Sequence, residues 1–330
     1  MRYIVGVDGG GTKTDILLCR EDGSCCGRTV VGGSNHQLIG LEQAGKTLLS
    51  GIEALLESQG VKRKELAAVC LGLSGADFEE DIRALEGIIA PLGQQVPCKV
   101  INDAWLPLAA MAPTGAGAVS ICGTGHNTAV RMADGKRLQI SALGYVLGNW
   151  GGGNMLTTQA MHAAMRAAEH TGEATRLTEE LPRAYGQADM LALQREFYLN
   201  HCQGMYAAPV PQMVSRLAAE KDAVCIRLLE HDGRVQAEMT AGLIAHAGLQ
   251  ARSLPVVLAG GLYLKDTSGY LVKGYREELL RRCPKARLML LDKPPVVGAA
   301  LLALQEAGLL RAGSSERIAG SIVMEEKIAI

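Results

Sequence analysis

The chain has 330 residues, of which 48% are apolar and 20% are charged, so it has enough apolar surface for a substantial core and enough length for two domains. This composition excludes a disordered or fibrous chain. The 33 lysines and arginines nearly balance the 34 aspartates and glutamates, and neither sign forms a long block, so the pattern of a nucleic-acid-binding protein is missing. The sequence shows neither a signal peptide nor an apolar run of about 18 residues, so we expect a cytoplasmic protein without a membrane partner.

Cysteine and glycine usage gives two further expectations. The nine cysteines are scattered from Cys19 to Cys283 without a CxxC pair, which is typical of small core residues rather than of a disulfide framework. Forty glycines against an aromatic content of 4% indicate many tight turns. Backbone N–H groups at such turns bind anions, and the composition therefore favours a phosphate ligand.

The first part of the chain alternates between strand and helix patterns. It opens with a buried strand at residues 2–7, a glycine turn at 8–15 and a second strand at 16–20. The periodicity then predicts, in chain order, a helix at 41–56 that stops by Gly60, a strand at 66–75, a helix at 77–93, a strand at 98–103 and a short helix that ends near Pro113. Such alternation predicts a parallel or mixed sheet flanked by helices.

A second series of strands follows a predicted domain boundary near 112–115. Residues 115–140 contain a strand, a glycine turn, a second strand, a hairpin turn and a third strand, which repeats the opening pattern and suggests internal duplication. The remaining predictions are mostly helix at 155–247 with interruptions near Pro182 and Pro209–Pro211, a strand with a glycine turn at 254–264, and a strand, proline break and apolar helix at 286–310. The tail from Gly313 gives no prediction.

The first glycine turn is a candidate phosphate site. It reads Asp8-Gly9-Gly10-Gly11-Thr12-Lys13-Thr14-Asp15, so three glycines let amide groups approach an anion, Thr12 and Thr14 add hydroxyls, and Lys13 adds a positive charge. Asp8 could hold Mg²⁺ through water, because this ion takes one or two carboxylates and keeps several waters. A plain glycine hairpin is the alternative interpretation.

Two further glycine turns follow apolar strands. The first reads Cys122-Gly123-Thr124-Gly125-His126-Asn127-Thr128 and again combines glycines with hydroxyls between two strands. The second, Ala259-Gly260-Gly261, could let a flat adenine ring lie against the backbone, although on its own it would be an ordinary turn.

Several ordered motifs together carry a resemblance that no single one could. The segments GGGTKTD, GSNHQLIG, INDAW, CGTGHNT, LAGGLYL and PPVVGAALLAL resemble the BadF/BadG/BcrA/BcrD group of the sugar-kinase, heat-shock-protein and actin superfamily, over about residues 3–305. The resemblance implies an α/β fold of the actin-like (ribonuclease H-like) ATPase class, with two domains around a cleft for ATP and sugar. The first domain would be residues 1–113, and a C-terminal helix at about 296–312 would pack on it. The second domain would be residues 114–295.

The activity implied by this resemblance is ATP-dependent phosphorylation of N-acetylglucosamine or a related amino sugar at the 6-hydroxyl. It implies ATP and Mg²⁺ as cofactors, an amino-sugar substrate, a homodimer, and no nucleic-acid partner. The implied site residues are the general base Asp103; Gly10, Gly11, Thr12, Lys13, Thr14, Gly123, Thr124 and Gly125 for phosphate; Gly260 and Gly261 for adenosine; Asn35, His36, Asp103, Thr124, Asn127 and Asn149 for sugar; and Asp8 for Mg²⁺ through water.

The chemistry of the residues agrees with parts of this assignment. Asp103 lies between a strand and a helix, and phosphoryl transfer to an alcohol needs a carboxylate that positions the hydroxyl and accepts its proton. A helix N-cap is the alternative role for Asp103 and is compatible with the first. The amide of Asn35 suits vicinal hydroxyls, whereas His36 is better explained as a packing residue of the loop before the long helix.

A second nucleotide motif is a decoy. Residues Gly40–Thr47 satisfy GxxxxGK[ST], but a P-loop needs a buried strand that ends at its first glycine. The preceding segment is short and polar, and the apolar helical period continues through Gly45 and Lys46. We therefore interpret this match as coincidental.

The sequence departs from the family at residues 147–154, LGNWGGGN, where the family usually shows GDEGS. Asn149 and Trp150 replace two acidic positions, and an amide keeps one acceptor while it loses the charge. Trp150 could stack on a sugar face or fill a gap. This departure leaves open a degenerate protein that only binds sugar or ATP. The resemblance itself offers a second alternative, the activator branch of the same family, whose members hold an iron–sulfur cluster through cysteine ligands and transfer electrons to an acyl-CoA dehydratase or reductase.

Overall fold

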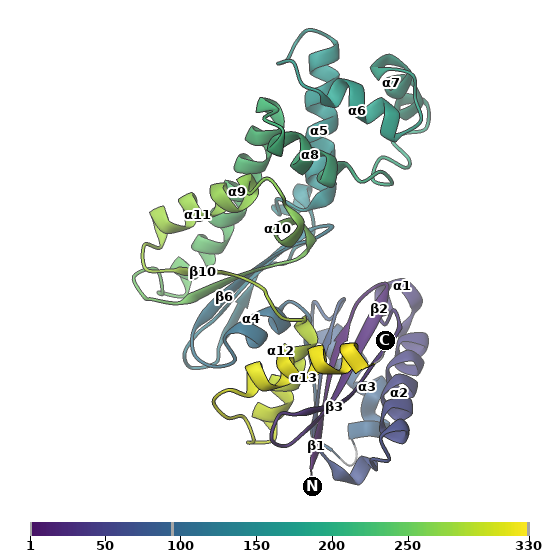
Figure 1. Ribbon diagram of the computed structural model, residues 1–330, viewed down its shortest axis with the longest axis vertical. Helices are drawn as coiled ribbons and strands as arrows, with labels where there is room; N and C mark the ends of the chain where they lie inside the picture. The colour runs from purple at the N-terminus through teal and green to yellow at the C-terminus, as the bar shows by residue number, and fades with distance from the viewer. Residues whose placement is uncertain (1, 94–95, 329–330) are drawn as a thin grey trace. The chain divides into compact units, whose positions relative to one another are not determined.

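The computed structural model describes residues 2–93 and 96–328 of the chain. The chain divides into two compact units: residues 1–115 with 291–330 form unit 1, and residues 116–290 form unit 2 (Figure 1). Each unit is built around its own sheet. Among the described residues, no helix has the length and apolarity needed to cross a membrane.

Unit 1 contains a mixed sheet in the order β3-β2-β1-β4-β5. Its strands are β1 (Tyr3–Gly9), β2 (Lys13–Arg20), β3 (Cys25–Gly32), β4 (Leu66–Leu73) and β5 (Cys98–Asn102). The first three pair antiparallel, and β4 and β5 run parallel to β1. The sequence did not predict β3, because this edge strand is only partly buried and lacks the apolar run of its neighbours.

Helices cover both faces of this sheet. They are α1 (His36–Ile39), α2 (Leu41–Ser58), α3 (Glu79–Gly93), α4 (Trp105–Met111), α12 (Pro295–Glu306) and α13 (Ser314–Ile328), with a 3₁₀ turn at Arg63–Glu65. Helices α2 and α3 pack together over one face, and α12 packs against β1 and α4 on the other (Figure 1). The predicted helix at 41–56 is confirmed as α2, whereas α13 lies in the tail from Gly313, for which we made no prediction.

Unit 2 repeats the strand topology of unit 1. Its strands are β6 (Gly117–Cys122), β7 (His126–Arg131), β8 (Arg137–Gln139), β9 (Pro255–Ala259) and β10 (Arg287–Leu290). Numbered from β6, the order β8-β7-β6-β9-β10 is again third, second, first, fourth, fifth, with an antiparallel meander followed by two parallel strands. The recurrence inferred from the glycine-turn patterns therefore extends to whole sheets.

The helices of unit 2 are α5 (Gly153–Ala168), α6 (Leu177–Ala184), α7 (Met190–Leu199), α8 (Val210–Ala219), α9 (Ala223–His246), α10 (Gly261–Lys265) and α11 (Tyr270–Arg282), with a 3₁₀ turn at Tyr145–Leu147. Two predictions need correction. Pro182 lies inside α6, and the chain leaves the helix only after Ala184. The predicted strand at 254–264 ends at Ala259, because the glycine turn leads into α10 instead of a second strand.

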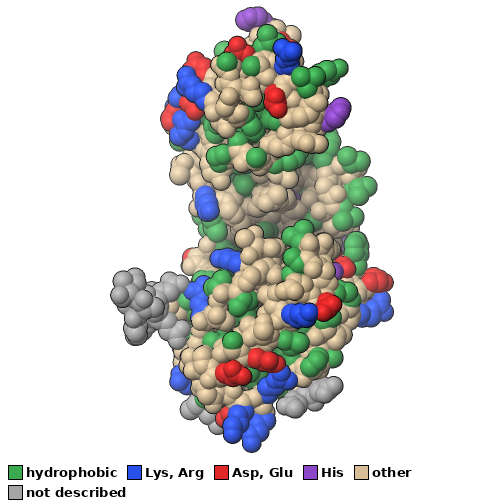
Figure 2. Space-filling view, turned by 90° about the vertical axis from the view of Figure 1, so that its right-hand side faces the viewer, with side chains coloured by type: hydrophobic (Ala, Val, Ile, Leu, Met, Phe, Trp, Pro, Cys, Tyr) green, Lys and Arg blue, Asp and Glu red, His purple; other side chains and the backbone are tan. Residues whose placement is uncertain are grey.

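The burial of the cysteines and the distribution of surface charges agree with what the composition led us to expect. Six of the nine cysteines are buried, two are partly buried and Cys202 is exposed. The face of the molecule in Figure 2 carries acidic and basic side chains side by side rather than in one large patch of either sign.

Candidate active site

The first glycine turn joins β1 to β2 in unit 1. The N–H of Gly10 donates to the carbonyl of Lys13 at 2.9 Å, and the carbonyl of Gly10 accepts from the N–H of Ser34 at the same distance. Thr12 and Lys13 are exposed. The turn is thus fixed at its base, and its exposed tip offers backbone donors, a hydroxyl and a cation for an anionic ligand.

Thr14 differs from its predicted role. Its side chain is fully buried, and Oγ1 lies 2.9 Å from the carbonyl oxygen of Gly32 and 2.8 Å from Oγ of Ser34. The hydroxyl of Thr14 therefore fastens β2 to the segment after β3. It is not available as a hydroxyl donor to phosphate.

Two carboxyl groups of unit 1 lie close enough to influence each other. Burial, followed by the charges of Asp103 and Asp15, raises the pKa of Asp8 to about 7, while Lys13 opposes this rise. Burial, followed by the charge of Asp77, raises the pKa of Asp103 to about 6. A cation would relieve this accumulation of negative charge, and Asp8 fits the one-carboxylate, water-rich coordination that Mg²⁺ prefers.

The backbone around Asp103 is held by its neighbours. Its N–H donates to the carbonyl of Leu73 at 3.3 Å, and Oδ1 of Asn102 accepts from the N–H of Ala104 at 2.9 Å. The amide of Asn102 in turn donates to Asp77 at 2.9 Å. The N-cap of α4 is Ala104 rather than Asp103. The carboxyl of Asp103 accepts from the backbone N–H groups of Ala104 and of Asp103 itself, and these hydrogen bonds oppose the rise of its pKa.

Asn35 and His36 belong to the same unit but make local contacts. Oδ1 of Asn35 caps α1 by accepting from the N–H of Gln37 at 2.9 Å, which leaves its amide N–H₂ as the group that could reach a ligand. His36 was expected in a loop and instead begins α1, with Nε2 at 3.3 Å from Oδ1 of Asp81. This contact with α3 fits the packing role for His36.

The second glycine turn, in unit 2, lies against the first turn of α5. The carbonyls of Gly123 and Thr124 accept from the N–H groups of Gly153 and Asn154 at 2.8 and 3.1 Å. At Gly152, φ is 94° and a Cβ atom would lie 2.4 Å from the Cα of Gly125, so only glycine allows this approach. Gly125 therefore packs against the loop before α5.

Three buried polar side chains follow this turn. Asn149 is 8% exposed, and its Nδ2 donates to the backbone carbonyl of His126 at 2.8 Å. In the described part of the chain, Oδ1 of Asn127 has no hydrogen-bond partner. The side chain of Asn149 also makes a hydrogen bond with the His126 ring. Buried polar atoms are usually satisfied, so Asn127 is the residue whose amide oxygen remains to accept a hydroxyl proton.

His126 itself is neutral at physiological pH. Its Nε2 lies 2.9 Å from Oγ of Ser120, and burial lowers its pKa to about 4. Because the ring is 2% exposed, we interpret His126 as a packing residue of the glycine turn rather than as a surface group.

The third glycine turn borders a pocket of about 420 Å³ that lies entirely within unit 2. Gly260 has φ 94°, and a Cβ atom there would lie 2.4 Å from the carbonyl oxygen of Cys122, so this glycine lets the turn approach β6. Residues from several segments of unit 2 line the pocket and include Gly123, Thr124, Tyr206, Gln212, Gly261 and Lys265. The sequence analysis identified the glycine turn. It recognised the loop before α8 only as an interruption at Pro209–Pro211 and did not predict that α8 lines a pocket.

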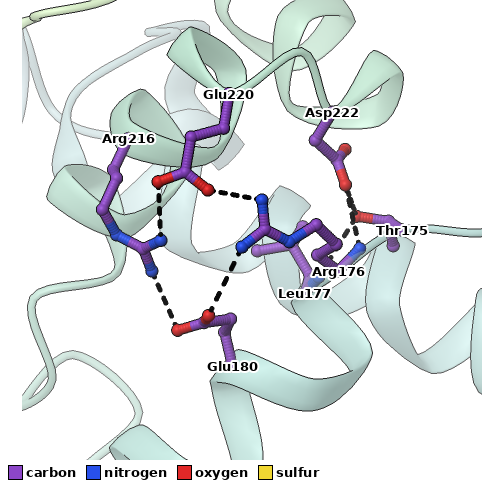
Figure 3. Close-up of polar contacts among 7 residues, drawn as sticks. All are labelled: Thr175, Arg176, Leu177, Glu180, Arg216, Glu220 and Asp222. Atoms are coloured by element: carbon purple, nitrogen blue, oxygen red, sulfur yellow. Dashed lines mark hydrogen bonds and ion pairs between the residues drawn. The ribbon is translucent and has the colours of Figure 1, made fainter.

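A ring of alternating charges holds the α8 wall of this pocket (Figure 3). Arg216 pairs with Glu180 at 2.8 Å and with Glu220 at 3.1 Å, and Arg176 closes the ring with Glu220 and, at 4.0 Å, with Glu180. Asp222 joins the same region by accepting from the N–H of Arg176 at 2.8 Å. The ring thus connects α6 to α8, which carries the pocket residues Gln212 and Ser215.

The decoy motif has no P-loop geometry. Residues 41–47 lie inside α2, and the element before Gly40 is α1 rather than a buried strand. Lys46 is on the exposed side of α2 and pairs with Glu42 at 2.6 Å. The structure therefore supports the coincidental interpretation.

Comparison with known proteins identifies the family. The BadF/BadG/BcrA/BcrD ATPase family matches residues 5–303. The chain belongs to this family. Family membership implies that it uses ATP, and its fold is the predicted actin-like ATPase fold.

Relatives of this family member cover almost its whole length. An N-acetylmuramic acid/N-acetylglucosamine kinase of Clostridium acetobutylicum is 26% identical over 93% of this chain and 99% of its own. An N-acetyl-D-glucosamine kinase of Dictyostelium discoideum is 24% identical over 91% and 97%. Among solved structures, a candidate N-acetylglucosamine kinase from Chromobacterium violaceum is 24% identical over 92% of this chain and 99% of its own, with a TM-score of 0.65.

Proposed function

We propose that this protein is an ATP-dependent kinase that phosphorylates N-acetylglucosamine or a related amino sugar at the 6-hydroxyl. The observation that carries the proposal is Asp103, a partly exposed carboxyl whose backbone is fixed, whose pKa burial raises to about 6, and which lies near Asp8. A carboxylate with such a pKa is ionised near neutral pH and still basic enough to take a hydroxyl proton. The names of two relatives that cover nearly the whole chain support an amino-sugar acceptor.

In this mechanism, Asp103 orients the sugar hydroxyl and accepts its proton as the new oxygen–phosphorus bond forms. The bond between the γ-phosphorus and the bridging oxygen breaks, and ADP leaves with the electron pair. The turn at Gly10–Lys13 of unit 1 and the turn at Gly123–Gly125 of unit 2 are the proposed phosphate-binding segments, and Lys13 offsets developing negative charge. When bound near Asp8, Mg²⁺ would neutralise charge on the phosphate oxygens.

The pocket in unit 2 is the proposed adenosine site. Its volume of about 420 Å³ lies in the range of small-molecule pockets, and Gly261 and Thr124 border it together with apolar residues such as Leu262. Asn127 and Asn149 are the proposed sugar-binding residues of unit 2, since each carries an amide oxygen of the kind that accepts a hydroxyl proton. Asn35 would contribute its amide N–H₂ from unit 1.

The two alternatives are less well supported. An activator with an iron–sulfur cluster needs accessible thiolates, but Cys122 is fully buried, and burial raises its pKa to about 12. A degenerate binding protein would not need a general base, whereas Asp103, with its raised pKa, can serve as one. A cytoplasmic location and a homodimer remain part of the proposal, and size-exclusion chromatography with light scattering tests the second.

A coupled ADP-release assay tests the function directly. The purified protein, ATP and Mg²⁺ are combined with a panel of amino and neutral hexoses, and we expect sugar-dependent ADP release with N-acetylglucosamine or a close relative. ATP binding without a response to any sugar would contradict the kinase proposal. A coloured protein that holds iron would favour the activator.

A further inference from the structure

A buried acid in unit 2 is not explained by the fold. Asp232 lies in the middle of α9 with 0% exposure. Its Oδ1 accepts from Nε1 of Trp150 and from Nε2 of Gln159, both at 2.9 Å, while Oδ2 has no partner among the described residues. Neither donor is charged. A carboxyl buried without a cation costs free energy that an apolar side chain of similar size would avoid, so stability alone does not account for it.

The first donor to this acid is held rigidly. The indole of Trp150 meets the ring of Tyr145 edge-on at 5.5 Å and the ring of His231 edge-on at 5.3 Å. With Nε1 fixed by Asp232 and two neighbouring rings in place, the indole cannot rotate without losing these contacts. Trp150 as a residue is only partly buried. The molecule thus holds a partly buried indole in one orientation at this point.

The position of this indole indicates what it could bind. Trp150 directly follows Asn149, whose Nδ2 donates to the carbonyl of His126 and whose Oδ1 is the acceptor end of the amide. A pyranose combines hydroxyl groups at its rim with ring faces of C–H groups, whose hydrogens are weakly positive and are attracted to the negative face of an aromatic ring. An amide acceptor beside an aromatic surface matches both features of a sugar.

We propose that Trp150 is an aromatic platform for the pyranose ring of the acceptor sugar and that Asp232 is the positioning residue that holds it. The proposal rests on the function proposed above and deepens it, because it names a substrate-contacting group that replaces an acidic side chain usual in the family. If Trp150 only filled a gap in the packing, it would make the same contacts with Asp232, Tyr145 and His231, but its fluorescence would not change when sugar binds.

Fluorescence separates these roles. Trp105 and Trp150 are the two tryptophans of the chain, so the variant Trp105→Phe leaves Trp150 as the single reporter. Titration with N-acetylglucosamine and with each sugar of the panel, without nucleotide, should give a saturable change in emission with the Kd that calorimetry measures on the same variant. Heat of sugar binding without an emission change would overturn the platform and leave the kinase proposal intact. If no sugar binds, the kinase proposal fails, and the platform fails with it.

Kinetics test the positioning role of Asp232. Asp232→Leu removes the acceptor of Trp150, and we expect the sugar KM to rise by about tenfold or more while the ATP KM stays within about twofold. Asp232→Asn keeps an oxygen acceptor and should restore the sugar KM to within about threefold of the wild-type value. An equal rise of both KM values, or an unchanged sugar KM in folded Asp232→Leu, would overturn this role.

A matched control lies two residues earlier on the same helix. Glu230→Leu also replaces an acid of α9 by leucine, but Glu230 faces Lys273, with a distance of 2.6 Å. Both KM values should stay within about twofold of wild type, because this pair is partly exposed and the indole contacts come from Tyr145, His231 and Asp232 instead. If Asp232→Leu does not fold, Trp150→Leu and Trp150→Phe supply the same comparison, with a rise of about tenfold expected for leucine and less for phenylalanine.

Discussion

At the scale of single residues, Asn149 shows how orientation limits what a substitution can do. Its Nδ2 donates to the carbonyl of His126 at 2.8 Å, so Oδ1 is the end that points away from this carbonyl. The side chain thus offers the same acceptor as the acid that the family usually has, but without a second oxygen. The sequence suggested that Asn149→Asp would restore a family feature, and the geometry changes that expectation.

We expect Asn149→Asp to destabilise the protein rather than improve it. One carboxylate oxygen would face the carbonyl oxygen of His126, so the hydrogen bond is lost and two acceptors oppose each other, at a cost of about 1–3 kcal/mol. Protonation relieves this clash, so the pKa of the new acid should be raised and the loss of unfolding free energy should be larger at pH 8 than at pH 5. Urea unfolding at both pH values measures the difference.

An exposed position provides the comparison for this variant. Gln203→Glu introduces the same charge in an exposed loop, and its unfolding free energy should stay within about 0.5 kcal/mol of wild type. Equal stabilities of Asn149→Asp and wild type at pH 8 would contradict the proposed orientation of the amide.

Asp103 gives a prediction on pH dependence. A general base must be ionised to act, and burial raises the pKa of Asp103 to about 6, so kcat/KM should rise with pH through about 6 and level off above it. Asp103→Asn keeps the shape of the side chain but cannot accept the proton, and turnover should fall by about 10²-fold or more. Steady-state kinetics between pH 5 and 8 test both statements. A variant within threefold of wild type, or one that keeps the rising limb, would remove Asp103 as the base.

How far the sequence predicted the site depends on what each residue contributes. The glycine turns and the place of Asp103 after a strand could be predicted, because they are local features, whereas the role of Asp103 as the base came from the family resemblance and stays a prediction. The burial of the Thr14 hydroxyl could not, since it depends on β3, a strand whose partly polar pattern hides it. Asp232 was missed for a similar reason, because a single acid within a long helical pattern is normally a surface residue.

At the scale of elements, the charge ring between α6 and α8 is a test of how the pocket wall is held. The ring side chains are 24–49% exposed, so each pair contributes little by itself, although a closed ring shares the cost of ordering its members. The ring lies on the helix that supplies Gln212 and Ser215 to the pocket. Its loss should therefore loosen this wall without affecting unit 1.

We expect Arg216→Glu to lower the unfolding free energy by about 1 kcal/mol, because it sets three acids against one arginine. The double variant Arg216→Glu with Glu180→Arg restores opposite charges at that contact and should recover part of the loss. In 1 M salt, the difference between Arg216→Glu and wild type should shrink, since exposed charges are screened. Urea unfolding at low and high salt measures this, and a loss that does not depend on salt would mean that packing, not charge, is responsible.

At the scale of the whole molecule, the two units have sheets with the same strand order but differ in the helices that cover those sheets. Alternation of strands and helices predicted this architecture in unit 1, because long apolar periods are strong local signals. The helical layer of unit 2 was predicted only as a block, since the ends of its helices depend on tertiary contacts such as the Asp222 cap and the charge ring. The position of Pro182 inside α6 is an example of this limit.

The phosphate-binding residues proposed here come from both units, and this leads to a prediction about nucleotide-linked stability. Mg²⁺ with a non-hydrolysable ATP analogue at about 100 times its Kd should raise the unfolding free energy by about 2.7 kcal/mol. Lys13→Ala, in unit 1, should reduce this gain although the 420 Å³ pocket belongs to unit 2, because the analogue loses a cation beside its phosphates.

Lys46→Ala is the control for this change. It makes the same substitution at an exposed lysine of unit 1 that belongs to the decoy motif and pairs only weakly with Glu42 across one helical turn. Its nucleotide-induced gain should equal that of wild type, as thermal unfolding with and without the analogue will show. If Lys46→Ala abolishes the gain and Lys13→Ala leaves it intact, the nucleotide phosphates lie at Gly40–Thr47, and the turn between β1 and β2 is not their binding site.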